Sequence, residues 1–274
     1  MDRREFIGTA GAALVSARFS PPARLERIGL ELYSVRDAMK ADPEGTLMKV
    51  RAMGYTDVEL LWTFNHFGLT LQQTKSILDK EGLEAPSAHI APEALTKDWQ
   101  KSLDEARFLG HQYLIVPSLP AETNKSIDAW RRWAGTFNNA GQQARKSGVW
   151  LAFHNEPSHH KAIDGVVPYD LFLRFTDPSL VRMQLDVGNM VMGGAQPARY
   201  IAQHGDRYFS FHIKDIPTGR GSDTELGNGT IDFKRVLGAI KDIQNKPCYV
   251  EQENAQSPMD SAARNYLYLK GLDF

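Results

Sequence analysis

The chain has 274 residues, of which 42% are hydrophobic and 24% are charged, and this composition excludes disordered and fibrous proteins. Its 32 basic and 33 acidic residues give a formal net charge of -1, so no overall field attracts nucleic acid or an anionic membrane. The single cysteine, Cys248, excludes an internal disulfide framework and a multi-thiolate zinc site, so any metal site must consist of histidines and carboxylates.

The first 24 residues differ in kind from the rest. An arginine pair, Arg3 and Arg4, precedes a short apolar run of small residues from Phe6 to Val15. This run is about half the ~20 residues that span a bilayer, so we expect no stable membrane association. RREFIG resembles a twin-arginine export signal. We therefore expect residues 1–24 to be an export signal with a short linker, which implies a periplasmic or exported protein; the alternative is an unstructured basic tail.

From Leu25 onward, short apolar segments alternate with longer amphipathic ones. In the latter, apolar residues recur at three- and four-residue spacing, which is typical of helices, and several end near a glycine that can adopt a left-handed conformation (Gly54, Gly82, Gly110 and Gly148). The apolar segments, which we predict as strands, span residues 28–35, 57–62, 83–90, 113–119, 149–156, 181–189, 208–216 and 248–254.

Eight strand–helix units in roughly 250 residues match the size of a (β/α)8 barrel. We therefore predict an α/β fold, a single TIM-barrel domain over residues 25–274. A doubly wound open sheet is the main alternative, but no glycine-rich phosphate motif follows any predicted strand.

Ionisable residues gather where the predicted strands end, which is where TIM barrels carry their chemistry. Because these ends converge on one axis, carboxylates there repel one another unless a cation neutralises them. A divalent ion bound by Asp186, His212, Glu251 and a residue of the fifth strand removes this conflict. Mixed nitrogen and oxygen ligands suit Mn, Co, Fe, Zn or Mg. The strand-end residues are Glu31, Glu59, His89, His154, Glu156, Asp186, His212, Lys214, Glu251 and Glu253.

The segments LAFHN, QLDVGN, FHIKD and YVEQE, in this order and spacing, resemble the sugar phosphate isomerase/epimerase superfamily with the xylose isomerase-like TIM barrel. The resemblance extends from Ile28 to the end of the chain. It implies one divalent metal held by a Glu, an Asp, a His and a second Glu on strands five to eight. The last three of these ligands correspond to Asp186, His212 and Glu251.

The fifth-strand ligand is where this sequence departs from the epimerases. Where they have a Glu, WLAFHNEPSHH places His154, with Glu156 two residues later on the same face of a regular strand. In a related branch with an HNH motif, the downstream ligand corresponds to His159. His154, Glu156 and His159 therefore compete for one position. If they do not bind metal, His159 and His160 are expected to be solvated loop residues.

The resemblance implies a metal-dependent carbohydrate isomerase or epimerase that removes a proton alpha to a carbonyl. We expect Glu156 or Glu251 to act as the base, and His89 and Lys214 to bind or protonate substrate oxygens. Glu59 and Glu253 are further candidate substrate contacts, and Glu253 is also a candidate partner of Glu251.

An asymmetric set of one imidazole and several carboxylates also suits a lyase or hydratase that eliminates a beta substituent from 3-keto-glycosides. Two other hypotheses for the function are a sugar-binding barrel without catalysis and an enzyme like the superfamily's apurinic-site endonuclease. The near-neutral charge argues against the latter. We expect a small unphosphorylated carbohydrate as substrate and no nucleic-acid partner, and the sequence is compatible with a homo-oligomer.

Overall fold

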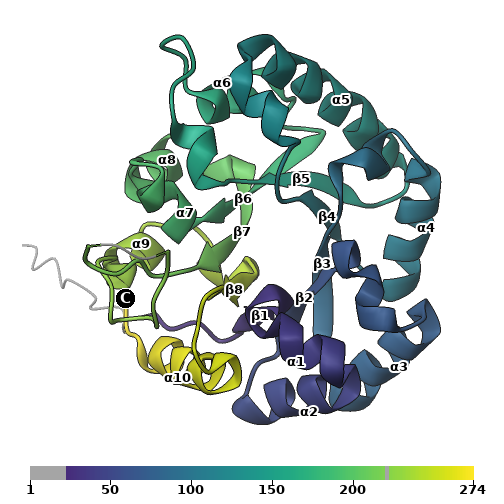
Figure 1. Ribbon diagram of the computed structural model, residues 1–274, viewed down its shortest axis with the longest axis vertical. Coiled ribbons are helices and arrows are strands. Elements are labelled where there is room, and N and C mark those ends of the chain that lie inside the picture. Colours follow the sequence, from purple (N-terminus) through teal and green to yellow (C-terminus); the bar gives the residue numbers. More distant parts are fainter. Residues whose placement is uncertain (1–22, 220–221) are drawn as a thin grey trace, which may run out of the picture.

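The computed structural model describes residues 23–219 and 222–274, and in them eight parallel strands form a closed barrel (Figure 1). All eight predicted strands are confirmed, although each is shorter than predicted. Hydrogen bonding joins each strand to its neighbour in sequence, and β8 to β1. The predicted export signal lies outside the described residues except for its last two. The strands are β1 Gly29–Glu31, β2 Asp57–Leu61, β3 Glu84–His89, β4 Tyr113–Val116, β5 Trp150–His154, β6 Val181–Asp186, β7 Tyr208–Ile213 and β8 Cys248–Val250.

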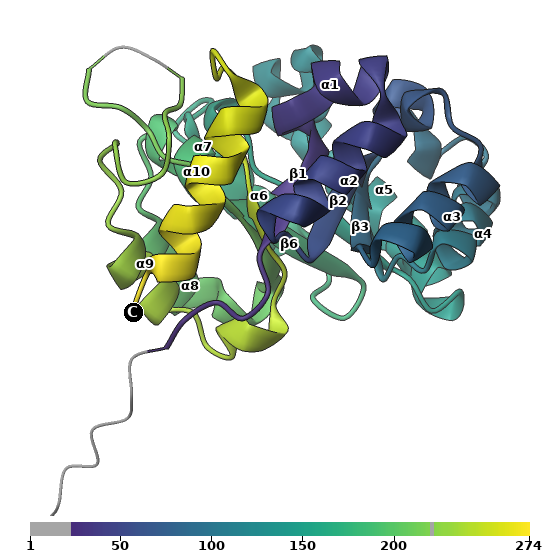
Figure 2. The same cartoon turned by 90° about the horizontal axis from the view of Figure 1, so that it is seen from below.

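Helices surround the barrel and follow the strands along the chain (Figure 1). The first described residues run beside the C-terminus (Figure 2), where the backbones of Ala23 and Phe274 exchange two hydrogen bonds of 2.9 and 3.0 Å. The α-helices are α1 Arg36–Ala41, α2 Pro43–Met53, α3 Leu71–Glu81, α4 Trp99–Leu109, α5 Ile127–Lys146, α6 Pro168–Phe175, α7 Val187–Met192, α8 Pro197–His204, α9 Phe233–Gly238 and α10 Pro258–Gly271.

Short 3-10 helices follow several strands, and helical residues replace some of the predicted strand ends. For example, residues 32–35 form η1 instead of continuing β1, and α7 begins directly after Asp186. The 3-10 helices are η1 Leu32–Val35, η2 Trp62–Gly68, η3 Pro92–Leu95, η4 Ala121–Lys125, η5 Pro157–His160, η6 Gly205–Arg207 and η7 Ile243–Asn245.

The predicted glycine stops are confirmed. Gly54, Gly82 and Gly110 cap α2, α3 and α4 in the left-handed conformation, with φ of 109°, 64° and 83°. Gly148, with φ of 77°, lies one residue beyond the C-cap of α5. Other residues pay a steric penalty at such φ values, which is why glycine marks these helix ends in the sequence.

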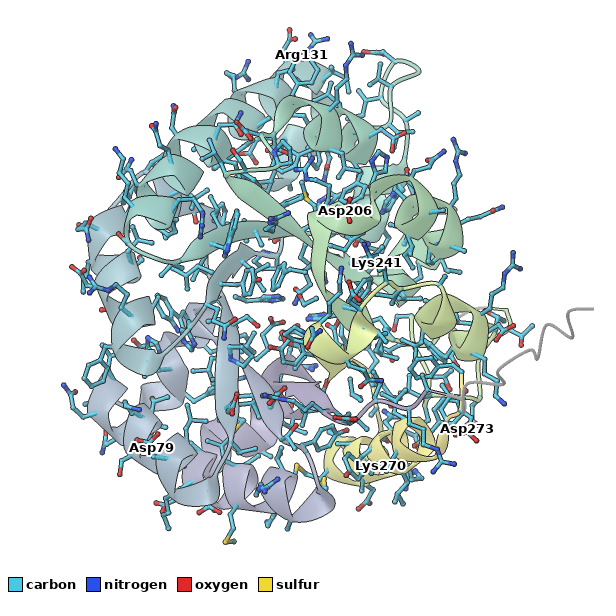
Figure 3. All side chains as sticks on the ribbon, turned by 180° about the vertical axis from the view of Figure 1, so that it is seen from behind. Asp79, Arg131, Asp206, Lys241, Lys270 and Asp273 are labelled. Atoms are coloured by element: carbon cyan, nitrogen blue, oxygen red, sulfur yellow. The ribbon has the colours of Figure 1, made fainter. Side chains whose placement is uncertain are left out.

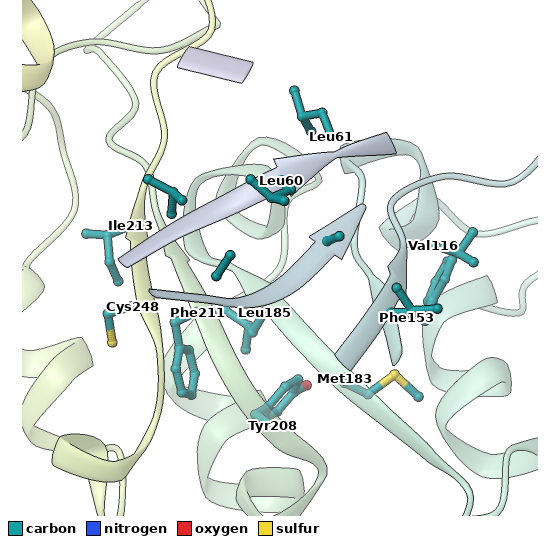
Figure 4. Close-up of a cluster of buried hydrophobic side chains, with 14 of the residues drawn as sticks. Leu60, Leu61, Val116, Phe153, Met183, Leu185, Tyr208, Phe211, Ile213 and Cys248 are labelled. Carbon is teal, nitrogen blue, oxygen red and sulfur yellow. The ribbon is translucent and has the colours of Figure 1, made fainter. Parts of the chain in front are cut away.

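The strands are apolar because the barrel is covered by helices. Side chains such as Val116, Phe153 and Leu185 are fully buried in the layer between barrel and helices (Figure 4). A second, smaller apolar cluster of Ile115, Ala152 and Phe209 is separate from this layer. The apolar side chains that alternate along the strands thus fill the outer layer and leave other strand positions to a polar interior.

Charged side chains such as Asp79, Arg131 and Lys270 lie at the outer edge of the helical ring (Figure 3). None of the helices in the described ranges is long and apolar enough to cross a membrane.

Candidate metal and substrate site

A cavity of about 250 Å³ lies where the carboxyl ends of the strands converge. Because β1, β2, β3 and β5 supply residues to it and Glu251 follows the end of β8, the cavity occupies the face of the barrel at which TIM-barrel chemistry takes place. Its lining residues are Glu31, Tyr33, Leu61, Thr63, Phe64, His89, Pro117, Ser118, His154, Glu156, Glu251 and Glu253.

Four buried side chains from consecutive strand ends form a compact cluster beside this cavity. One ligand atom from each of His154, Asp186, His212 and Glu251 lies within 4.8 Å of the others. His154 Nε2 and Asp186 Oδ2 are 3.6 Å apart, and neither has a hydrogen-bond partner among the described residues. Burial lowers the pKa of His154, so the imidazole is neutral and has a free lone pair. A buried imidazole nitrogen that lacks a partner and faces a buried carboxylate oxygen fits a pair of ligands for a shared cation.

The local backbone explains how Asp186 comes to lie in this cluster. It is the last residue of β6 and the N-cap of α7, where its Oδ1 accepts a hydrogen bond of 2.7 Å from the Asn189 backbone N–H. The other carboxylate oxygen is left for the cluster. The Asn155 side chain exchanges hydrogen bonds of 3.0 and 2.9 Å with the backbone of Asp186, which ties β5 to β6 at this level.

His212 lies between two carboxylates. Its Nδ1 is 2.9 Å from Glu251 Oε2, and its Nε2 is 2.6 Å from Glu59 Oε2. Glu59 is completely buried and also accepts hydrogen bonds from the Ser87 hydroxyl at 2.5 Å and the Gln184 amide at 2.9 Å. Burial alone would raise the pKa of Glu59, but His89 and His212 hold it well below its usual value. Glu59 is therefore an anion that orients the His212 ring.

Lys214 is 1% exposed, and its positive charge offsets the negative charge of the carboxylates in the cluster. Its Nζ lies 3.3 Å from Asp186 Oδ2 and 3.2 Å from Glu251 Oε2, and it also pairs with Glu253. Burial alone would lower the pKa of Lys214, but these carboxylates hold it well above its usual value. A Cβ at Gly188 would come within 2.7 Å of the Lys214 side chain, so the glycine in LDVGN makes room for this lysine.

Beyond β5 the chain turns into η5, which separates the three candidates for the fourth metal position. Glu156 lines the cavity, where burial raises its pKa to about 8. His159 accepts a hydrogen bond of 2.9 Å from the Glu156 backbone N–H and stacks on Phe153, with ring centroids 5.2 Å apart. His159 and His160 are buried, so the expectation that they are solvated was wrong. Of the three candidates, His154 alone is a member of the four-residue cluster.

The structure brings most, but not all, of the predicted site residues to the cavity. His89, His154, Glu156, Glu251 and Glu253 line it. Asp186 and His212 complete the cluster beside it. Glu59 and Lys214 do not line it, because their charged groups are held inside the polar interior. The substrate contacts expected for these two residues therefore stay a prediction, while the structure shows both charged groups paired with neighbouring side chains.

Sequence reasoning missed several polar residues that support the site. Gln184 and Ser87 lie two residues before Asp186 and His89 on the same strands, and strand alternation was the signal that could have found them. Glu31 is among the predicted strand ends, but its position in the sequence indicates no role. Asp215 had no such signal, because its buried carboxylate accepts backbone hydrogen bonds from Ile216 and three residues of the loop that follows (Gly227, Gly229 and Ile231).

Comparisons with known proteins agree with this geometry. The family described as "Xylose isomerase-like TIM barrel" matches residues 47–274. An inosose dehydratase of Lacticaseibacillus casei is 24% identical over 209 residues, which cover 61% of this chain and 68% of that protein.

Two solved structures are similar to this chain over most of its length. A sugar phosphate isomerase/epimerase from Parabacteroides distasonis ATCC 8503 has a TM-score of 0.79 and 25% identity, covering 90% of this chain and 98% of that one. The IolI protein with a bound zinc atom has a TM-score of 0.72 and 13% identity, covering 90% and 99%, so it shares the fold. The resemblance carried by LAFHN, QLDVGN, FHIKD and YVEQE is confirmed: the chain belongs to the family of xylose isomerase-like TIM barrels.

Proposed function

We propose that the protein is a metal-dependent carbohydrate isomerase or epimerase that begins its reaction by removing a proton alpha to a carbonyl. The observation that carries this proposal is the buried cluster of His154, Asp186, His212 and Glu251 beside a cavity lined by further carboxylates. The sugar isomerase, epimerase and dehydratase names of similar proteins support the choice of substrate class.

In this proposal the four cluster residues hold one divalent ion. The partnerless Nε2 of His154, which faces Asp186 Oδ2 at 3.6 Å, supports this, as does the zinc in the similar fold of IolI. Two imidazoles and two carboxylates suit Mn, Co, Fe or Zn, and less readily Mg. When bound, such an ion supplies a Lewis acid that polarises the substrate carbonyl.

The chain's own residues divide the remaining work. Glu156 is the base, because it lines the cavity without belonging to the ligand cluster and its carboxylate accepts a long hydrogen bond of 3.5 Å from the Asn189 amide. Burial raises its pKa to about 8, and a cation held by the four cluster residues would favour its carboxylate form. Lys214 fixes Asp186 and Glu251 in place, His89 lies between Glu31 and Glu59, and Glu253 at the cavity wall contacts substrate oxygens.

A second candidate outcome after the same first step is loss of a beta substituent. The name of the Lacticaseibacillus casei relative, an inosose dehydratase, favours such an elimination. The two reactions share the removal of the alpha proton and differ in whether that carbon is reprotonated or a C–O bond breaks.

Solvent deuterium tests the shared step and product analysis separates the outcomes. The metal-loaded protein is incubated in D2O with an inosose, D-fructose and a 3-keto-glucoside, and each probe is followed by NMR and mass spectrometry. We expect deuterium at the alpha carbon of at least one probe, and a loss of about 10²–10⁴-fold in that exchange for Glu156→Gln. A labelled epimer or isomer identifies the first reaction, and an unsaturated ketone the second. Absence of exchange with every probe would contradict the proposal.

We also propose that residues 1–24 direct export through the twin-arginine route, on the basis of Arg3, Arg4 and the small apolar run after them. Fractionation of cells should place the protein in the periplasm, and a variant with lysine at both arginine positions in the cytoplasm. A cytoplasmic wild-type protein would contradict this.

A further inference from the structure

Glu31 is a buried carboxylate that faces the cavity and belongs to no other site. It ends β1, is 1% exposed and lines the cavity. Its Oε2 has no hydrogen-bond partner among the described residues. A buried carboxylate oxygen without a partner is costly, and such an atom at a cavity wall fits an interaction with a bound molecule. Glu31 is not part of the cluster of four candidate metal ligands.

The other carboxylate oxygen of Glu31 is backed by His89. Glu31 Oε1 lies 3.4 Å from His89 Nδ1. On its far side, His89 Nε2 lies 3.1 Å from Glu59 Oε2 and 2.9 Å from Gln184 Oε1. With acceptors on both sides, the ring is best satisfied when both nitrogens carry a proton. His89 thus links Glu31 to the anionic Glu59 in the barrel interior.

Glu31 and Glu156 flank the cavity from opposite walls. The closed strand order places β1 and β5 half-way around the barrel from each other. Glu31 ends β1, Glu156 follows β5 by two residues, and both line the cavity. A substrate bound between them would have one carboxyl group on each side.

We propose that Glu31, held by His89, is the second acid/base residue of the reaction and acts from the wall opposite Glu156. This inference rests on the proposed function, in which Glu156 removes the alpha proton. It provides the second carboxyl group that is otherwise missing where His154 stands in place of a glutamate.

The reaction has two steps, and each moves one proton between the substrate and a glutamate. Glu156 takes the alpha proton as the C–H bond breaks, its electron pair forms a C=C bond, and the carbonyl π pair moves onto oxygen. For inversion, the carbonyl re-forms and the C=C pair takes a proton from the Glu31 carboxyl on the opposite face.

For elimination, the carbonyl re-forms, the C=C pair shifts to the alpha–beta bond, and the beta C–O bond breaks while the departing oxygen takes the Glu31 proton. Either way, Glu31 ends as a carboxylate and Glu156 as an acid. Burial raises the pKa of Glu31 to about 8, which fits a carboxyl group that holds a proton at neutral pH.

Glu31→Gln in the full chain separates the two steps. Its matched control is Glu26→Gln, which makes the same change at an exposed position before the other end of β1. The probes are an inosose, D-fructose and a 3-keto-glucoside in D2O. We expect Glu31→Gln to keep its metal content, its melting temperature and deuterium exchange at the alpha carbon. We expect it to lose about 10²-fold or more of its product formation. Glu31→Asp, which retains a carboxyl group, should recover part of that loss.

The outcomes distinguish this inference from the proposed function. Wild-type product formation in Glu31→Gln, alongside a fully active Glu26→Gln, would overturn the inference and leave the proposed function standing. Loss of deuterium exchange in Glu31→Gln, with metal content retained, would make Glu31 the first base and overturn its place as the second group. Absence of exchange in the wild type with every probe would overturn the proposed function and this inference with it.

Discussion

Binding of a divalent cation at the four-residue cluster should raise the melting temperature of the protein. The ligand atoms of His154, Asp186, His212 and Glu251 come within 4.8 Å of one another because the closed barrel brings the ends of β5 to β8 together. An unfolded chain offers no such site. A ligand that binds only the native state stabilises it by RT ln(1 + [L]/Kd), which is about 2.7 kcal/mol at a free concentration of 100 Kd.

The size of the described fold converts this free energy into a temperature. For the roughly 250 residues in ranges 23–219 and 222–274, an unfolding entropy of about 2.1 cal/mol/K per residue gives about 0.5 kcal/mol/K. The expected increase in melting temperature is therefore about 5 °C at 100 Kd. If only half of these residues unfolded together, the melting temperature would increase by about twice as much. The size of the increase therefore also tests whether the barrel unfolds as one unit.

Differential scanning calorimetry of metal-free protein, titrated with MnCl2 or ZnCl2, measures the shift, and equilibrium dialysis supplies the Kd. Asp186→Asn and His154→Ala should lose most of the shift. Asp79→Asn removes an exposed carboxylate on α3 and should keep it. Comparing each variant with and without metal cancels any change in its metal-free stability. No shift in the wild type, or equal shifts in Asp186→Asn and Asp79→Asn, would refute the reasoning.

Three further predictions test other parts of the structure. Burial lowers the pKa of His111 from 6.5 to about 4, so below pH 6.5 the unfolded chain binds a proton that the fold excludes, and stability falls with acid. The free energy of unfolding, measured in urea, should therefore decrease from pH 7.5 to pH 5 in both proteins. The decrease should be about 2 kcal/mol smaller for His111→Gln than for the wild type, and equal decreases would contradict the burial of this ring. Asp215→Asn should accelerate amide exchange at Gly227 and Gly229 by at least about tenfold, because one of the two accepting oxygens is lost, and unchanged rates would contradict that role. Glu156→Gln should keep the metal-induced increase in melting temperature while it loses alpha-proton exchange; loss of both would make Glu156 a ligand.

The barrel could be predicted from the sequence because its strands are buried by helices. Leu185 and Phe211 belong to short strands in which apolar residues recur at alternate positions and pack against the helices. The helices carry three- and four-residue periodicity and end at left-handed glycines such as Gly82. Each of these patterns involves residues that are close together in the chain, so each can be recognised in a single sequence.

The candidate site was harder to predict from the sequence, because strand alternation gives the direction of a side chain but not its depth along the barrel axis. Glu59 and His89 both point inward, yet only His89 reaches the cavity, since Glu59 is held below it by His212. Lys214 lies beyond the end of β7, where alternation gives no guidance, and its amine reaches the Asn189 side chain at 3.2 Å. The buried turn that places His159 against Phe153 likewise depends on packing that no local pattern reveals.

The most direct test of the account is anomalous diffraction from crystals grown with Mn²⁺ or Zn²⁺. We predict one peak beside the cavity, bonded at about 2.0–2.2 Å to His154, Asp186, His212 and Glu251. Glu156 should remain unbonded and lie within reach of a bound sugar analogue. A peak bonded to Glu156 or His159 in place of His154, or no peak at this cluster, would contradict the central claim that these four residues form the metal centre.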